Sequence, residues 1–174
     1  MNKFFIAIAT LMIGTPVMAT GSFEDHQNLW ESLQSVGVRT EINAKDCDGG
    51  SDGFYQTYRR RLVICQDNGT PGGREVKWTY NDLDTLRHEA HHVVQDCLGG
   101  RPFDGRLDNL FEDKKLAKFV TDRLTEDQVN FIIQTYSEKG APDHVIMKEL
   151  EAFAVASAVS PTVIASAVRD ACSL

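Results

Sequence analysis

Apolar residues recur every three or four positions in several segments of the chain, a spacing typical of helices that pack one face on a core. The predicted helices cover about residues 24–36, 82–98, 110–119, 125–137 and 143–159. A last short helix carries Cys172. Two segments rich in β-branched and aromatic residues, 38–42 and 54–65, predict strands, and the second is either one long strand or a hairpin. After one first helix, strands precede helices, so we expect the α+β class, with a small antiparallel or mixed sheet packed on a helical bundle.

The central predicted helix begins near Asn81 or Asp82 and contains the segment RHEAHHVVQDC at 87–97. At about 100° per residue its apolar side chains fall in one arc, which is the face that packs on a core. His88 and His92 are four residues apart, so they lie one turn apart on roughly the opposite side, and Glu89 flanks them. Two imidazoles on one helical face bind a single metal, and the neighbouring carboxylate can polarise a water molecule on that metal. The alternative is an exposed helix face that merely carries polar residues.

A catalytic zinc needs a third protein ligand from elsewhere in the chain. The metzincin continuation of the motif is excluded, because it requires glycine and histidine at the positions of Gln95 and Leu98. The remaining common solution is a glutamate on a later helix. The chain supplies one in the segment KELEAFAVA at 148–156.

Two glutamates of this segment are candidates. Glu149 is followed three residues later by Ala152, a small residue that lets two helices approach closely, and Glu151 begins a second match to the same pattern. Glu149 is favoured because it shares a helical face with apolar residues. Glu151 lies one turn from Lys148, with which we expect it to form a surface ion pair.

This pattern, HExxH followed downstream by ExxA on a second helix, resembles that of the gluzincin metallopeptidases. The resemblance covers residues 63–156 and is closest to small members of that group. It implies a zincin-like domain in which His88, His92 and Glu149 bind Zn²⁺ and Glu89 is the general base.

Other residues have candidate roles around such a site. The segment RLVIC at 61–65 is interpreted as either the edge strand beside the cleft, where it would pair with a peptide substrate, or an ordinary core strand. Asp96, one turn beyond the second motif histidine, is a candidate acceptor for a ligand imidazole or a solvated aspartate. His91, Tyr136 and His144 are alternative partners for the oxyanion of amide hydrolysis, and the residues alone do not choose among them.

The N-terminus reads as a secretory signal peptide: Lys3 is followed by an apolar run, and cleavage is expected after Ala19. Residues 20–174 then form one domain. The formal net charge of −7 becomes −8 without Lys3, and there is no basic cluster beyond 59–61, which argues against nucleic acid as a partner. The apolar run is too short to span a bilayer, so we expect no membrane insertion.

An even number of cysteines in an exported chain predicts disulfides, and four cysteines allow three connectivities. Pairing of Cys47 with Cys65 and of Cys97 with Cys172 is favoured. A zinc site of four thiolates is the rival, but the chain has no CxxC pair.

These observations lead to a first hypothesis: a secreted or periplasmic zinc-dependent peptidase that hydrolyses peptides or proteins with a metal-bound water, Glu89 acting as the base. The alternative is a disulfide-stapled, zincin-like binding or inhibitor module without hydrolase activity. The presence of Glu89 separates the two, since a binding module does not need a general base.

Overall fold

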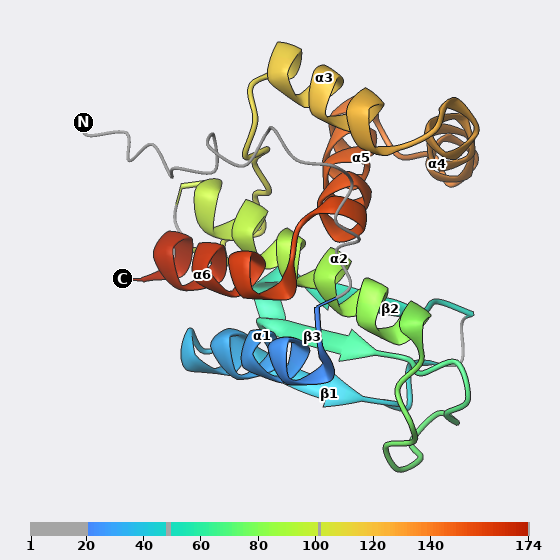
Figure 1. Cartoon of the computed structure of the whole chain (residues 1–174), viewed down its shortest axis with the longest axis vertical. Helices are drawn as coiled ribbons and strands as arrows, with labels where there is room; N and C mark the ends of the chain where they lie inside the picture. The colour runs from blue at the N-terminus through green and yellow to red at the C-terminus, as the bar shows by residue number, and fades with distance from the viewer. Residues whose placement is uncertain (1–20, 48–49, 101, 174) are drawn as a thin grey trace.

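The computed structural model describes residues 21–47, 50–100 and 102–173 (Figure 1). The predicted signal peptide lies outside these ranges. Within them, six α-helices and a three-stranded mixed sheet confirm the α+β class. In chain order the elements are α1 (Phe23–Ser35), β1 (Arg39–Ile42), β2 (Gly53–Gln56), the 3-10 helix η3 (Thr57–Arg59), β3 (Arg61–Ile64), α2 (Tyr80–Leu98), α3 (Asp113–Arg123), α4 (Glu126–Glu138), α5 (Asp143–Ala158) and α6 (Pro161–Cys172).

The segment 54–65 forms a hairpin rather than one strand, since η3 and the left-handed Arg60 (φ 48°) separate β2 from β3. The strand order is β1-β3-β2, with β1 parallel and β2 antiparallel to β3. RLVIC is therefore in the central strand, and the edge-strand interpretation is wrong. Its run of consecutive apolar residues is buried on both faces, as in a central strand. The edge strand next to α2 is β2.

Helix boundaries follow local capping chemistry. The chain leaves α1 through a Schellman motif: Gly37 has φ 85°, and its N–H and that of Val38 donate to the carbonyls of Gln34 and Leu33. The central helix begins slightly earlier than predicted, at Tyr80, and its N-cap is Thr79 rather than Asn81 or Asp82. The hydroxyl of Thr79 accepts from the Asp82 amide, and the Asp82 carboxylate accepts from the Thr79 amide.

The predicted helix at 110–119 begins later, as α3 at Asp113. The Leu110 amide donates instead to the buried carboxylate of Glu151, 2.8 Å away, which holds this stretch in a loop conformation. The helix predicted at 125–137 is present as α4, which opens with a capping box of Thr125 and Gln128.

The helix α2 is the centre of the molecule, where it packs on α1, α5, α6 and the sheet (Figure 1). Every residue from 86 to 97 is buried, on all sides of the helix. The interpretation of the histidines as part of an exposed polar face is therefore wrong. Arg87, fully buried, ties α2 to two neighbours, donating to the Ala156 carbonyl (2.8 Å) and lying 2.7 Å from His26 Nε2.

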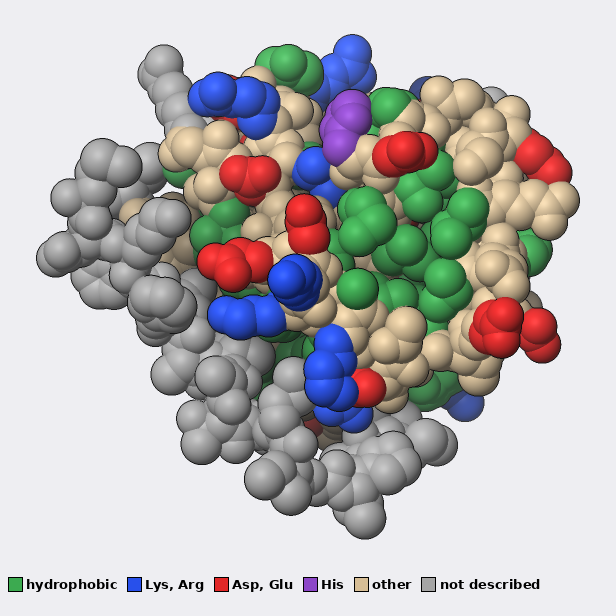
Figure 2. Space-filling view, turned by 90° about the horizontal axis from the view of Figure 1, so that it is seen from above, with side chains coloured by type: hydrophobic (Ala, Val, Ile, Leu, Met, Phe, Trp, Pro, Cys, Tyr) green, Lys and Arg blue, Asp and Glu red, His purple; other side chains and the backbone are tan. Residues whose placement is uncertain are grey.

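The outer surface of α3 and α4 lies at the end of the molecule seen in Figure 2, where hydrophobic side chains gather among interspersed acidic and basic ones. Two of the large hydrophobic residues of α4, Phe131 and Ile133, are 69% and 39% exposed. None of the helices in the described ranges is long and apolar enough to cross a membrane.

Two disulfides are present, with the favoured pairing: Cys47 with Cys65 and Cys97 with Cys172. The first joins the segment after β1 to the end of β3. The second joins the end of α2 to the end of α6, over a separation of 75 residues against 18 for the first.

Because a longer closed loop restricts the unfolded chain more, the double substitution Cys97→Ala/Cys172→Ala should lower the free energy of unfolding more than Cys47→Ala/Cys65→Ala does. From loop entropy, the expected losses of unfolding free energy are about 4.5 kcal/mol for the Cys97–Cys172 disulfide and about 3.2 kcal/mol for the Cys47–Cys65 disulfide. Urea unfolding of the two variants and the wild type measures both losses. The reverse order would show that strain or residual structure, rather than loop length, sets the contribution of these disulfides.

Candidate metal centre

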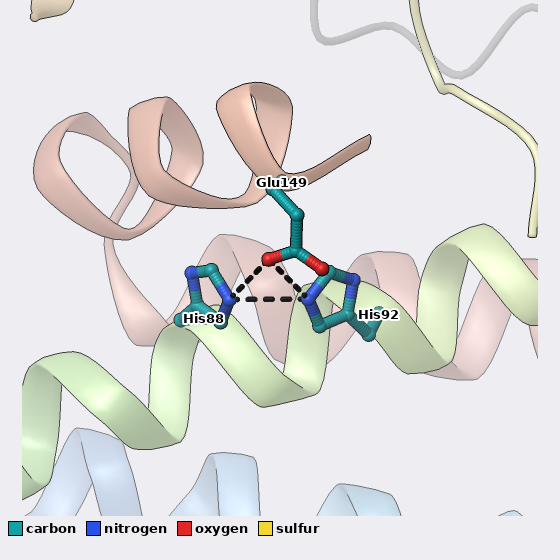
Figure 3. Close-up of side chains that lie close together, drawn as sticks. All are labelled: His88, His92 and Glu149. Atoms are coloured by element: carbon teal, nitrogen blue, oxygen red, sulfur yellow. Dashed lines mark hydrogen bonds and ion pairs between the residues drawn. The ribbon is translucent and has the colours of Figure 1, made fainter. Parts of the chain in front are cut away.

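His88 and His92 on α2 and Glu149 on α5 point toward one another (Figure 3). The two Nε2 atoms are 3.1 Å apart, and Glu149 Oε2 lies 3.3 Å from that of His88 and 3.4 Å from that of His92. Both histidines are buried, and the Glu149 side chain is 14% exposed. The structure thus brings together the three residues that the sequence suggests as metal ligands.

The geometry of this cluster fits a divalent metal. Ligand atoms of a tetrahedral zinc site, at bond lengths of about 2.0–2.1 Å, lie roughly 3.3–3.4 Å apart. The three distances of the triangle match this spacing within a few tenths of an ångström. Glu149 Oε2 is buried and has no partner in hydrogen-bond geometry, although it lies close to both imidazoles. Two imidazole nitrogens and a carboxylate oxygen are also the donor set that zinc prefers.

Burial and neighbouring charges shift the pKa values of this cluster in opposite directions. Burial lowers the pKa of His92, but the close contact with the charged carboxylate of Glu149 outweighs it and raises that pKa to about 9. For Glu149, burial raises the pKa, and its contacts with His88 and His92 outweigh this and hold the pKa well below its usual range. The carboxylate is therefore ionised and able to bind a cation.

Glu89 lies beside the cluster on α2 and is 7% exposed. Burial raises its pKa, while the charges of His88 and His92 lower it. The backbone of Tyr55 in β2 lies near this carboxylate and favours its charged form slightly. The strand approaches this closely because residue 53 is glycine: a Cβ there would lie 2.6 Å from Cγ2 of Thr85, on the same helix.

A cavity of about 210 Å³ opens onto the cluster. Five elements of the chain contribute to its walls: β2, α2, the loop before α3, α4 and α5. The lining residues besides the cluster are Gly53, Phe54, Tyr55, Glu89, Leu107 and Tyr136. Residue patterns offered no signal for Leu107, which reaches the cavity from a loop.

Of the three candidate oxyanion partners, the structure brings only Tyr136 to the cavity. Burial, together with the charge of Glu149, raises the pKa of Tyr136, so the phenol keeps its proton. His91 is buried elsewhere, with its Nε2 3.1 Å from Glu151 Oε1. His144 is exposed at the start of α5.

The role suggested for Asp96 is not observed. Its Oδ2 accepts from the hydroxyl of Tyr55 at 2.8 Å, and the residue beside the His92 ring is Gln95, whose Oε1 lies 2.8 Å from Nδ1. Helical spacing could have predicted this contact, because Gln95 lies three residues after His92 and seven after His88, on the same face of the helix.

Glu151 is not near the cluster, and the expected surface ion pair with Lys148 is wrong. Glu151 is fully buried, where it accepts from His91 and from the Leu110 amide. Lys148 instead donates to the carbonyl of His144. Of the two ExxA glutamates, one faces the histidine pair and the other anchors the loop before α3.

Comparison with known proteins adds a family but no activity. Searches of curated proteins and of solved structures found no match. One family model matches residues 15–172, which is most of the chain. The chain therefore belongs to the family described as a domain of unknown function, DUF8637.

Proposed function

We propose that this protein is an exported, zinc-dependent peptidase. The observation that carries the proposal is the convergence of His88, His92 and Glu149, in tetrahedral spacing, beside the buried carboxylate of Glu89. The two disulfides are consistent with export to an oxidising compartment.

In this proposal His88, His92 and Glu149 hold the zinc ion. When bound, zinc supplies Lewis-acid chemistry, lowering the pKa of a water molecule and polarising a carbonyl group. Glu89 accepts a proton from the attacking water and passes it to the leaving amine. Its raised pKa suits both steps, because a base whose pKa is nearer neutrality also returns the proton readily.

The edge strand β2 supports a peptide as substrate. The amide of Cys65 donates to the Asp52 carbonyl at 2.8 Å, so the backbone groups of Asp52 point toward β3. Backbone direction alternates along a strand, so the backbone N–H and C=O of Phe54 also point toward β3, whereas those of Gly53 and Tyr55 point away from the sheet. The Tyr55 backbone lies near Glu89, and the Gly53 carbonyl accepts from the Ser51 hydroxyl. An extended peptide would then pair with the Gly53 N–H and the Tyr55 C=O, beside the base.

Tyr136 is proposed as the donor that stabilises the oxyanion. Tyr136→Phe removes the hydroxyl and keeps the ring, so kcat should fall roughly a hundredfold, in the range for loss of one oxyanion donor. KM for a peptide should change little. The measurement is steady-state kinetics at saturating zinc, with Tyr80→Phe, an exposed tyrosine 61% accessible, as the matched control. An unchanged kcat in Tyr136→Phe would remove this residue from the mechanism.

The proposed activity is tested by adding zinc to the metal-free mature protein in the presence of a diverse peptide library. Mass spectrometry should detect internal cleavage that rises with zinc and levels off at about one equivalent per chain. A protein that binds one zinc and cleaves no peptide would refute the peptidase proposal and favour a binding or inhibitor module.

A further inference from the structure

Gln95 contacts both helices that contribute to the cluster. It is fully buried on α2, and its Oε1 lies 2.8 Å from Nδ1 of His92. Its Nε2 donates to the backbone carbonyl of Lys148 on α5, at 3.1 Å. Lys148 directly precedes Glu149 in the chain. A single amide side chain therefore joins one histidine of the cluster to the residue adjacent to its carboxylate.

These contacts determine where the His92 ring carries its proton. A backbone carbonyl can only accept, so the Gln95 group facing Lys148 must be the NH₂. The amide oxygen then faces His92, and an oxygen can only accept, so His92 Nδ1 must carry a proton. In the neutral ring Nε2 is consequently left with a lone pair, and Nε2 is the atom that points at His88 and Glu149.

The other histidine has no comparable support. Nδ1 of His88 is buried without a hydrogen-bond partner in the part of the chain that the structure describes. Its ring is held by packing, with the Phe153 ring 4.3 Å away between centroids. The hydrogen-bonded orientation of the cluster thus depends on Gln95.

We propose that Gln95 is a positioning residue that prearranges the metal centre, fixing the tautomer of His92 and the register of α2 against α5 at Glu149. This inference rests on the proposed function, since it requires that the cluster bind zinc. Metal-ligating histidines are commonly oriented by a carboxylate or carbonyl on the other ring nitrogen, and losing such a partner weakens metal binding. Here the neutral amide of Gln95 orients the histidine, and it also hydrogen-bonds to a second helix, α5.

The test is Gln95→Met, which keeps the length of the side chain and removes both hydrogen bonds. The matched control is Gln66→Met. Gln66 is also buried, and its amide joins Asn43 to the backbone of Val76, none of which lines the cavity. Zinc affinity is measured by competition with a chelating dye, and thermal unfolding of the metal-free proteins reports structural damage.

Zinc affinity should fall roughly ten- to a hundredfold in Gln95→Met and stay at the wild-type value in Gln66→Met, even if both unfold at lower temperature. Equal affinity in Gln95→Met and wild type, with zinc bound by both, overturns the role of Gln95 and leaves the proposed function standing. A wild-type protein that binds no zinc refutes both.

Should Gln95→Met fail to fold, NMR of the imidazole protons in the zinc-loaded wild type decides instead. The His92 Nδ1 proton should be protected from exchange with solvent and show cross-relaxation with the Gln95 side chain. A freely exchanging proton at that nitrogen would contradict the proposal.

Discussion

Substituting Glu89 by glutamine should strongly reduce peptide hydrolysis and leave zinc binding intact. Glutamine keeps the size and shape of the side chain, but it cannot take a proton from the attacking water. The rate should fall by roughly a hundredfold or more, the usual range for losing a positioned general base. Zinc content should stay near that of the wild type, because His88, His92 and Glu149 are untouched.

Stability provides an independent check on this variant. Burial disfavours the charge on Glu89, so the neutral amide should leave the melting temperature of the metal-free protein unchanged or higher. Glu24→Gln, the same chemical change on an exposed residue of α1, is the control for activity. Full hydrolysis by Glu89→Gln would exclude Glu89 as the base.

The second large effect is expected on metal binding, from Glu149→Gln. An anionic ligand becomes a neutral amide that binds zinc poorly, so affinity should fall more than about a hundredfold, beyond the loss typical of outer-shell partners. Glu151→Gln is the matched variant two residues away on the same helix. The glutamine keeps one oxygen that accepts from His91 and Leu110, but its NH₂ takes the place of the buried Oε2, which has no hydrogen-bond partner, so the fold should lose about 1–3 kcal/mol. The folded fraction should bind zinc normally.

Competition with a chelator and urea unfolding, applied to both glutamine variants, measure the two effects separately. The opposite assignment, in which Glu151→Gln loses zinc and Glu149→Gln keeps it, would mean that the metal-bound protein has a different arrangement of α5. Zinc retained by both variants would place the third ligand elsewhere in the chain.

Local spacing predicted much of the candidate site. His88 and His92 share a face because helical geometry puts residues four apart on the same side, and a preference for Glu149 followed from its apolar neighbours on the second helix. The prediction for Glu151 was wrong: it was expected at the surface because Lys148 lies one turn away. In the structure that carboxylate is buried, since His91 and the Leu110 amide provide hydrogen bonds that compensate for the loss of water.

Other features depend on contacts between distant segments. The central position of β3 results from pairing with β1, on the other side of a turn-rich segment, and no local pattern specifies strand order. The consecutive apolar residues Leu62, Val63 and Ile64 were a usable signal for a central strand, because strands with one face open to solvent alternate apolar and polar residues. Tyr136 and Leu107 reach the cavity through the packing of α4 and a loop, which periodicity does not describe.

In the proposed metal centre, His88, His92 and Glu149 hold one metal ion beside Glu89. Anomalous diffraction at the zinc edge, from crystals of the zinc-loaded mature protein, tests it most directly. One anomalous peak is expected within bonding distance, about 2.0–2.2 Å, of His88 Nε2, His92 Nε2 and a Glu149 carboxylate oxygen. Crystals grown with saturating zinc that show no peak at this position, or a peak bound by other residues, would contradict it.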